Sequence, residues 1–250
     1  MNPDISVIIP TYMRPEKLAR ALTSVEAACS LPYEVLVIDD CPDGSAFLVA
    51  MQFNAQYCCK AGNNRGLAAS RNIGITLAKG KYILFLDDDD FLASGSIDAL
   101  SQALRNGLSF AYGDNFDCFV DRQVHNNLSQ LTYDHLLICN RIPVGSYLIE
   151  RSSIKRNFDE RMRSHEDWEF LLNNLEWERS IRVPIHVVTI DKTENLESSM
   201  QARRRKYFYL DYISIYSRYP APHLTSFRQA MLQTLGISIA SELLGHKDVI

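Results

Sequence analysis

The stretch Tyr82-Ile83-Leu84-Phe85-Leu86-Asp87-Asp88-Asp89-Asp90 decides how the rest of the chain is interpreted. Its first five residues are aromatic or branched, and they predict a buried strand. Four carboxylates follow directly, and they repel one another unless a cation or hydrogen-bond donors compensate their charge. Carboxylates at the carboxyl end of a buried strand lie where open α/β sheets bind ligands, and an oxygen-rich cluster suits Mg²⁺ or Mn²⁺. The alternative is an acidic turn that caps a helix starting near Ser94 or Ser96, and the rest of the chain has to decide.

The composition is that of an ordinary soluble globular protein of 250 residues with a formal net charge of −4. This length predicts one large α/β domain or one and a half domains, and the charge does not indicate a nucleic-acid partner. No apolar run is long enough to span a membrane, and Met1-Asn2-Pro3-Asp4 lacks the features of a signal peptide. The six cysteines show no CxxC spacing, so we expect reduced thiols in a cytoplasmic protein and no zinc site.

Predicted strands and helices alternate in the first third of the chain. Such alternation favours a mostly parallel sheet with helices on both faces. Gly80 occupies the position expected of a helix C-cap. The expected elements are a strand at Ile5–Pro10, a helix from Pro15, a strand at Glu34–Ile38, a weaker strand around Ala55–Lys60, a helix at about Leu67–Ala78 and the strand that begins at Tyr82.

The pattern changes after Asp90, where extended segments and helices no longer alternate strictly. From Glu194 the composition shifts again, and 201–250 reads as a helical C-terminal extension with two apolar or aromatic stripes. The expected elements are a helix around Ile97–Leu104, an extended segment at Ser109–Val120 with Gln123–Asn126 as its candidate pairing partner, a helix at Leu131–Cys139, a strand at Gly145–Ile149, a helix that starts at Glu166-Asp167 and a strand at Arg182–Ile190.

Acidic residues recur at three places that end a predicted strand or begin a predicted helix: Asp39-Asp40, Asp87–Asp90 and Glu166-Asp167. With this order and spacing, the sequence resembles glycosyltransferase family 2, inverting enzymes of GT-A fold, over roughly residues 4–192. The motifs that carry the resemblance are Ser6–Tyr12 with Arg14, Val37–Asp40, Asn64–Asn72, Tyr82–Asp90 as a DxDD-type motif, and Phe158–Glu160 leading into Glu166–Phe170.

The resemblance implies a GT-A fold, which is a Rossmann-like, mostly parallel sheet flanked by helices, here with the helical C-terminal extension. We expect a glycosyltransferase domain at 1–200, with a nucleotide-sugar-binding half at 1–92 and an acceptor and catalytic half at 93–200. The implied reaction is metal-dependent inverting transfer of a sugar from a nucleotide-diphosphate donor, expected to be a UDP-sugar, to the hydroxyl of a glycan, lipid-linked or protein acceptor. Surface polysaccharide, lipopolysaccharide or other glycan assembly is the expected context.

The resemblance also assigns residues to the donor site. Asp39 would accept a hydrogen bond from the base or ribose, and its alternative role is to cap the turn at Pro42. Arg71 could reach the base or the diphosphate, where its fork of donors suits phosphate oxygens, and its alternative is a surface salt bridge. The expected nucleotide-sugar-binding residues are Pro10, Thr11, Tyr12, Arg14, Asp39, Arg71, Asp87 and Asp88.

Asp87 and Asp89 form the DxD pair that the resemblance assigns to the ribose and to a metal bound by the diphosphate. The leaving nucleoside diphosphate gains negative charge as the glycosidic bond breaks, and a divalent cation, Mn²⁺ or Mg²⁺, neutralises that charge. Asp89 is the first choice for the metal ligand, with Asp87 as a further ligand or a ribose contact. Asp90 is either another metal ligand or an N-terminal cap, and the sequence does not separate these roles.

Asp167 is the expected catalytic base, with Glu166 as its neighbour in the catalytic pair. An inverting transfer needs a carboxylate that takes the proton of the acceptor hydroxyl as that hydroxyl attacks. Burial or the neighbouring Glu166 would raise the pKa of Asp167, whereas the helix N-terminus would lower it. The alternative is that the two acids only cap the helix that contains Trp168.

A basic cluster opens the C-terminal extension at Arg203, Arg204, Arg205 and Lys206. It could close over the diphosphate, or it could contact anionic lipid head groups and hold the protein at the inner face of a membrane. It could also be a solvated helix face, which is what a charge run usually is.

Three other functions were weighed. A protein that keeps the fold but has lost catalysis would be free to lose the acids that this chain retains. A sugar nucleotidyltransferase usually has a glycine-rich basic loop after the first strand, and Thr11–Pro15 contains no glycine. A dinucleotide-binding dehydrogenase would need GxGxxG at the same place, and it is absent.

Overall fold

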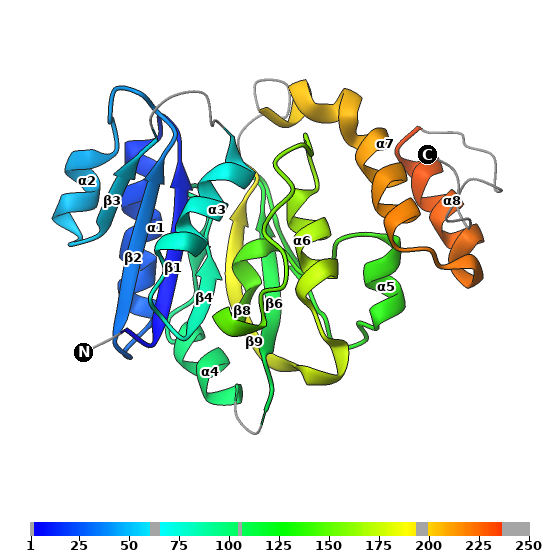
Figure 1. The fold of residues 1–250 in the computed structure, drawn as a ribbon, viewed down its shortest axis with the longest axis horizontal. Helices are drawn as coiled ribbons and strands as arrows, with labels where there is room; N and C mark the ends of the chain where they lie inside the picture. The colour runs from blue at the N-terminus through cyan, green and yellow to red at the C-terminus, as the bar shows by residue number, and fades with distance from the viewer. Residues whose placement is uncertain (1–2, 61–65, 105–106, 194–199, 237–250) are drawn as a thin grey trace.

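The computed structural model describes residues 3–60, 66–104, 107–193 and 200–236. Within these residues one sheet has the strand order β3-β2-β1-β4-β8-β6-β9-β5, with β7 paired to β6 (Figure 1). The strands are β1 (Ile5–Thr11), β2 (Tyr33–Asp39), β3 (Gln56–Cys59), β4 (Tyr82–Phe85), β5 (Phe91–Leu92), β6 (Phe110–Cys118), β7 (Gln123–Asn126), β8 (Tyr147–Glu150) and β9 (Ser180–Asp191).

The first half of the sheet is parallel, as the alternation of strands and helices predicts. Strand β1 pairs in parallel with β2 on one side and with β4 on the other, and β3 pairs in parallel with β2. All residues of β1 are buried, which is the pattern of a strand covered on both faces. The carboxyl ends of β1, β2 and β4 therefore lie side by side, at the same end of these parallel strands.

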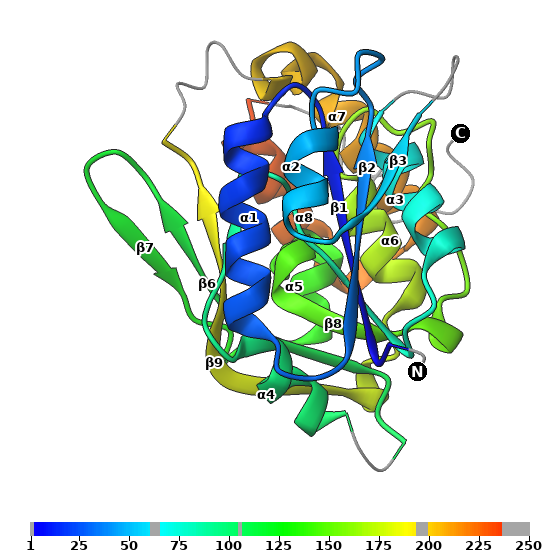
Figure 2. The same cartoon turned by 90° about the vertical axis from the view of Figure 1, so that its left-hand side faces the viewer.

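The second half of the sheet is mixed. Strand β8 is antiparallel to both β4 and β6, whereas β6 and β9 run parallel. The predicted pairing of Ser109–Val120 with Gln123–Asn126 is confirmed as the antiparallel β6–β7 hairpin, which projects from the sheet in Figure 2. The GT-A class of fold is thus confirmed, with its parallel strands in the first half and its antiparallel pairings in the second.

Helices cover both faces of the sheet, and each face has its own hydrophobic core. Helices α1 and α4 lie on one side of the sheet, and α3 and α6 lie on the other (Figure 2). The helices of the two faces are α1 (Pro15–Ala28), α2 (Phe47–Gln52), α3 (Leu67–Leu77), α4 (Ser96–Ala103), α5 (Tyr133–Ile138) and α6 (Glu166–Asn174), with short 3₁₀ turns at Val144–Ser146, Arg151–Ser153 and Trp177–Arg179.

Two sequence predictions about glycines are wrong. Strand β8 begins at Tyr147 and not at Gly145, because Ser146 bonds back to the carbonyl of Pro143 through its amide and its hydroxyl and closes a 3₁₀ turn. Gly80 is not the C-cap of α3, since the cap residue is Ala78. A Cβ at Gly80 would lie 2.6 Å from backbone atoms of β1, so this glycine permits close backbone contact.

Two elements have no counterpart in the sequence prediction. Helix α2 is six residues long, and strand β5 is two residues long. Both are too short to show a period in the sequence. Strand β5 nevertheless joins the acidic stretch to the far edge of the sheet, because it pairs with β9.

The C-terminal region is helical as predicted, with α7 (Met200–Arg218), a 3₁₀ turn at Pro222–Leu224 and α8 (Thr225–Thr234). Arg228 of α8 is fully buried, and its guanidinium donates to the carbonyls of Leu137 and Tyr219. This arginine fixes α8 to α5, on the side of the sheet that α6 covers. The side chains of Arg203–Lys206 and all of residues 237–250 lie outside what the structure describes. No helix in the described residues is long and apolar enough to cross a membrane.

Glu34 links the parallel strands near their amino-terminal ends. Its carboxylate accepts hydrogen bonds from Ser6 Oγ at 2.6 Å, from the Lys79 amide at 2.6 Å and from Gln56 Nε2 at 2.7 Å. Burial alone would raise the pKa of Glu34, but these hydrogen bonds outweigh it and lower the pKa below its ordinary value. A carboxyl group with a lowered pKa stabilises the fold at pH values above its unfolded pKa, and this contribution is lost as the pH falls through the folded pKa.

We therefore expect Glu34→Gln to lower the free energy of unfolding at pH 7 by about 1–2 kcal/mol. The difference from wild type should shrink as the pH falls below about 4.5, and urea unfolding between pH 7 and pH 3 measures it. Glu26→Gln, at an exposed position of α1, is the control and should change little at any pH. A Glu34→Gln difference that stays constant across this range would contradict the assignment.

Candidate active site

The four aspartates after β4 alternate between buried and partly exposed positions. The side chains of Asp87 and Asp89 are 30% and 26% exposed, whereas Asp88 and Asp90 are buried. Asp88 accepts a hydrogen bond of 2.7 Å from Thr11 Oγ1 of β1. Asp90 accepts one of 2.9 Å from the amide of Asp191 in β9. Asp88 and Asp90 thus fix the acidic loop to the sheet, and Asp87 and Asp89 are left toward the surface.

The carboxylates of this loop are crowded, and their pKa values show it. Burial raises the pKa of Asp88 to about 6, although the hydrogen bond from Thr11 lowers it. Burial and the charge of Asp87 raise the pKa of Asp89. Burial, followed by the charges of Asp87 and Asp89, raises the pKa of Asp90 well above its ordinary value. Burial is the largest cause of all three shifts, and the charges of neighbouring aspartates add to it.

The side chains of Arg14 and Arg20 bring two positive charges next to the acidic loop. Arg14 Nη1 lies 2.7 Å from Asp89 Oδ2 and 3.4 Å from Asp88 Oδ1. The residue before it, Met13, has a left-handed backbone with a φ of 55°, which turns the chain sharply after β1. Arg20 Nη2 contacts the Asp89 carbonyl and the Asp191 carboxylate. Arg20 was not predicted, because nothing in the pattern of α1 distinguishes it from a solvated arginine.

The remaining residues of the first loop lie at the end of β1. Pro10 is buried in the strand opposite Ile38 of β2, and Thr11 is buried through its bond to Asp88. Tyr12 is 44% exposed, so its ring remains available at the same edge of the sheet as Asp87 and Asp89. The predicted role of these residues in base binding stays a prediction.

Asp39 adopts the capping role that the sequence left as an alternative. It is fully buried, and its carboxylate accepts from the amides of Cys41 at 2.8 Å and Ala46 at 3.2 Å and from the Tyr57 hydroxyl at 2.9 Å. These bonds close the turn after β2. A contact to a base or ribose would have to share or replace them.

Asp40 and the unpredicted Lys60 hold the loop that leads into α3. Asp40 accepts from the Gly66 amide at 2.7 Å and pairs with Lys60 Nζ at 3.1 Å. Lys60 is buried and also donates to Ser70 Oγ at 3.1 Å. A lysine directly after a short edge strand gives no sequence signal of burial, so only the three-dimensional pairing identifies it. Arg65, in the motif Asn64–Asn72, lies outside the described residues.

Arg71 connects the acidic loop after β4 with the acid pair at the start of α6. It is 1% exposed and lies in α3. Its Nη2 lies 2.6 Å from Asp87 Oδ1, and its Nη1 lies 3.1 Å from Glu166 Oε1. Burial opposes the charge, but Asp87 and Glu166 outweigh it and raise the pKa of Arg71. Arg71 is therefore a permanent buried cation at the junction of β4 and α6, and not one half of a surface salt bridge.

Asp167 lies in the first turn of α6, partly exposed. Its Oδ2 accepts a hydrogen bond of 2.8 Å from Asn140 Nδ2, which follows α5. Its neighbour Glu166 is buried against Arg71. The two residues therefore differ in role. Glu166 holds the start of α6 against Arg71, whereas the side chain of Asp167 remains partly exposed. Asn140 was not predicted, because a single asparagine between two elements has no distinguishing pattern.

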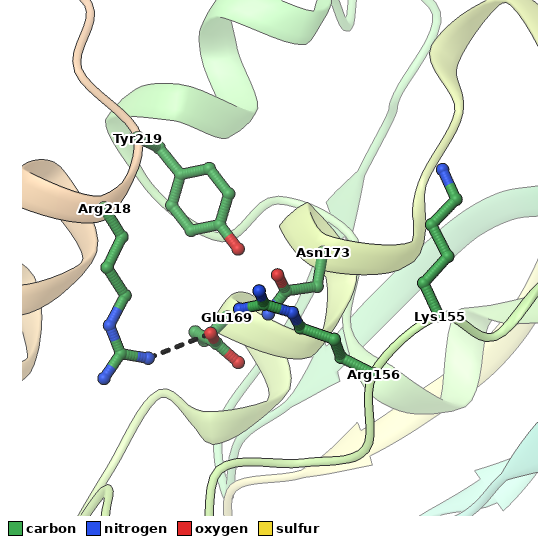
Figure 3. A pocket seen from close by; sticks show the side chains of 6 residues that line it. All are labelled: Lys155, Arg156, Glu169, Asn173, Arg218 and Tyr219. Carbon is green, nitrogen blue, oxygen red and sulfur yellow. Dashed lines mark hydrogen bonds and ion pairs between the residues drawn. The ribbon is translucent and has the colours of Figure 1, made fainter.

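A pocket of about 380 Å³ lies elsewhere, beside the outer face of α6 (Figure 3). Arg218 Nη1 pairs with Glu169 there at 2.9 Å, and Lys155 Nζ pairs with Glu176 at 2.6 Å. None of the predicted site residues lines this pocket. We therefore assign it to the packing of α7 on α6 and keep the acid cluster as the candidate active site. The lining residues are Lys155, Arg156, Glu169, Asn173, Arg218 and Tyr219.

The acid cluster offers carboxylate oxygens, which are suitable ligands for a divalent cation. Among the described residues, no group of three or more His, Cys, Asp or Glu is arranged to hold a metal alone. However, Mg²⁺ commonly uses one or two carboxylates together with substrate phosphates and does not require an all-protein cage. Asp87 pairs with Arg71 and Asp89 pairs with Arg14, but both carboxylates remain partly exposed, so they fit such a shared site.

The sequence and fold were compared with known proteins. The family model "Glycosyl transferase family 2" matches residues 6–208. An uncharacterised glycosyltransferase of Haemophilus influenzae is 31% identical over 181 residues, which cover 69% of this chain and 72% of the relative. The UDP-Glc:α-D-GlcNAc-diphosphoundecaprenol β-1,3-glucosyltransferase WfgD of Escherichia coli is 27% identical, with 53% of this chain and 54% of WfgD covered.

Among solved structures, Staphylococcus aureus TarS 1–349 in complex with UDP-GlcNAc superposes with a TM-score of 0.72 at 18% identity. The match covers 94% of this chain and 73% of the TarS chain. At this identity the likeness concerns the fold, and it is the GT-A arrangement of a sheet between two helical layers. Since the family model covers most of the chain and its acids meet at the expected edge of the sheet, this protein belongs to glycosyl transferase family 2.

Proposed function

We propose that this glycosyltransferase moves a sugar from a UDP-sugar to a hydroxyl acceptor with inversion at the anomeric carbon. The observation that carries the proposal is the position of Arg71, which bonds both Asp87 after β4 and Glu166 beside Asp167. One buried cation thereby places a donor-binding carboxylate and a candidate base in one site. The class of donor is supported by the UDP-Glc in the name of WfgD and by the UDP-GlcNAc bound to TarS.

In the proposed reaction the acceptor hydroxyl oxygen attacks the anomeric carbon on the face opposite the leaving diphosphate. Asp167 accepts the hydroxyl proton as the new C–O bond forms and the bond to the phosphate oxygen breaks. Asn140 holds one oxygen of Asp167 at 2.8 Å and so fixes its orientation. Arg71 neutralises the charge of Glu166. Asp167 is then the partly exposed carboxylate of the pair.

The donor side of the site uses the acidic loop and the first loop of the chain. Asp87 is proposed to bind the ribose and Asp89 to bind the metal, with Asp88 and Asp90 holding the loop in place through Thr11 and Asp191. Mn²⁺ or Mg²⁺ bound by Asp89 and the donor phosphates would neutralise the charge that develops on the leaving diphosphate. Tyr12 and Arg14 border this region, and we propose that they contact the base and the diphosphate.

The acceptor is proposed to be a growing surface polysaccharide or lipid-linked glycan. This rests on the lipid-linked acceptor in the name of WfgD. A peripheral membrane contact through Arg203–Lys206 would suit such an acceptor, and it stays a prediction.

The proposal is tested by thermal unfolding with UDP-glucose, UDP-GlcNAc, UDP-galactose and GDP-mannose, each with and without Mn²⁺. A native donor at about 100 times its Kd should stabilise the fold by about 2.7 kcal/mol, which raises the Tm by about 5–10 °C for a chain of this size. Asp89→Ala should remove the Mn²⁺-dependent part of this shift. Asp121→Ala, at a side chain 73% exposed beside β7, should retain it.

Three outcomes would count against the proposal. Absence of any shift with all four donors would contradict donor binding. Equal Mn²⁺-dependent shifts in Asp89→Ala and wild type would contradict the metal assignment. Binding without transfer to any acceptor, and without hydrolysis of the donor, would favour the alternative of a nucleotide-sugar-binding protein that has lost catalysis.

A further inference from the structure

The residue before the catalytic pair has an unusual backbone. His165 adopts the left-handed conformation, with a φ of 55° and a ψ of 20°, immediately before α6 begins at Glu166. For a residue with a Cβ this conformation is unfavourable, because the Cβ crowds the following carbonyl oxygen. Such strain persists only where the surroundings impose it, and it clusters at functional sites. The contacts that hold His165 are therefore informative about Asp167, two residues further on.

The imidazole ring of His165 is enclosed by aromatic side chains, most of them from α7. Its centroid lies 4.9 Å from that of Phe208 and 4.8 Å from that of Tyr212, both in edge-to-face geometry. The ring of Trp168, one turn into α6, lies at 6.2 Å. Edge-to-face pairs at these distances are attractive and directional. The ring of His165 is thus fixed by a helix that contributes no residue to the acid cluster.

A buried carboxylate of α7 holds the backbone of the same loop. Asp211 Oδ2 accepts from the Ser164 amide at 2.7 Å and from Ser164 Oγ at 2.6 Å. Asp211 is 7% exposed and Ser164 is 5% exposed. These are charge-assisted hydrogen bonds shielded from water, which are the strong kind.

The same serine also connects to the histidine. Ser164 Oγ lies 2.8 Å from His165 Nδ1. A hydroxyl has one proton, and Ser164 gives it to Asp211, so its oxygen accepts from His165 and Nδ1 carries hydrogen. Burial lowers the pKa of His165, although the charges of Asp167 and Asp211 oppose this effect. The ring is therefore neutral near pH 7, with one fixed tautomer.

We propose that α7 positions the catalytic base, and that Asp211 and His165 are positioning residues that set the loop from Ser164 to Asp167. This inference rests on the proposed function of Asp167. Three residues of chain separate the amide that Asp211 holds from Asp167, and a span of that length covers at most about 10 Å. Release of Ser164 would therefore move the carboxylate, and a displacement of about 1 Å can cost about 10²-fold in rate.

The test compares Asp211→Ala with Tyr216→Phe, a change on the same face of α7. Tyr216 donates a buried hydrogen bond of 2.7 Å to the Ile138 carbonyl and does not contact Ser164. Asp211→Ala is expected to lower kcat at least tenfold while the KM for the donor stays within about twofold. The side chain in Asp211→Asn can still accept a hydrogen bond from Ser164, so this variant should retain most of the wild-type kcat. Tyr216→Phe should lower the Tm and leave kcat unchanged.

Hydrogen–deuterium exchange gives a readout that does not depend on turnover. In Asp211→Ala, exchange in the peptide that contains residues 163–168 should accelerate at least tenfold, whereas Tyr216→Phe should leave this peptide as in wild type. If Asp211→Ala does not fold, Ser164→Ala removes the hydroxyl that contacts both Asp211 and His165, and the same acceleration is expected. Unchanged exchange in the folded variant, or an equal kcat loss in Tyr216→Phe, would overturn the proposal.

His165→Asn separates the backbone from the ring. Asparagine accepts the left-handed conformation but cannot fill the aromatic enclosure. We expect kcat to fall at least tenfold with unchanged donor affinity, and a wild-type kcat would remove His165 from the proposal. If the wild-type protein neither transfers nor hydrolyses any donor sugar, the proposed function fails, and the exchange experiment still decides whether α7 holds the loop.

Discussion

Asp167→Asn is expected to lower kcat by about 10²–10⁴-fold, the usual contribution of a general base. Asparagine has the shape of aspartate and can still accept the hydrogen bond that Asn140 donates to Oδ2. It cannot take a proton at neutral pH. The donor contacts proposed for Asp87 and Asp89 lie on a different element, so donor affinity should stay within about twofold of wild type.

The measurement is steady-state transfer, or donor hydrolysis where no acceptor is known, together with calorimetric donor binding. Asp134→Asn is a matched control, since Asp134 occupies the first turn of α5 and faces His223 at the surface. It makes the same chemical change at a comparable helix position and should leave kcat unaltered. Full transfer activity in Asp167→Asn would exclude Asp167 as the base.

Arg71→Leu is expected to destabilise the protein by about 3–5 kcal/mol, because it leaves Asp87 and Glu166 without their shared cation. The loss should be largest in the absence of ligand. Urea unfolding by circular dichroism measures it. Arg179→Leu is the control, since Arg179 pairs with Glu176 at the surface, and exposed pairs contribute about 0–1 kcal/mol.

A second substitution tests the cause of this loss. In Arg71→Leu/Glu166→Gln one of the two uncompensated charges is removed, so part of the lost stability should return. If the double variant is no more stable than Arg71→Leu, the loss arises from packing of the arginine stem against its neighbours, which include the Phe158 ring at 5.3 Å, and not from charge.

The parallel half of the sheet was predictable because its information is local. Runs such as Ile5–Ile9 and Glu34–Ile38 are buried on both faces, and short helical periods separate them. Such alternation favours parallel neighbours joined by right-handed connections, but it leaves the order of the strands open. Beyond Asp90 the neighbours of each strand lie far along the chain, and the antiparallel position of β8 between β4 and β6 has no local signal.

The candidate site likewise combines residues that the sequence identifies with long-range contacts that it does not. The sequence named the acids and Arg71, but it could not show that Arg71 bonds Glu166, which is 95 positions away. It left Asp39 between two roles, and only the donors around its carboxylate show that it caps a turn. Asn140, Lys60 and Arg20 act through single long-range contacts, and a single polar residue leaves no period or spacing by which it could be recognised.

The pairing of the short strand β5 determines when, during synthesis, the acidic loop can reach its final position. It pairs Phe91 and Leu92 with Thr189 and Val188, and beside it Asp90 binds the amide of Asp191. The parallel strands of the first half can assemble while β9 is still inside the ribosome. The acidic loop has its Asp88 contact to Thr11 from the start, but it acquires its second anchor, at Asp90, about a hundred residues later, once β9 has emerged. A fragment that ends after Leu92 would therefore carry the proposed donor-binding motif with only one of its two anchors, and we expect it to bind the donor more weakly than the whole chain.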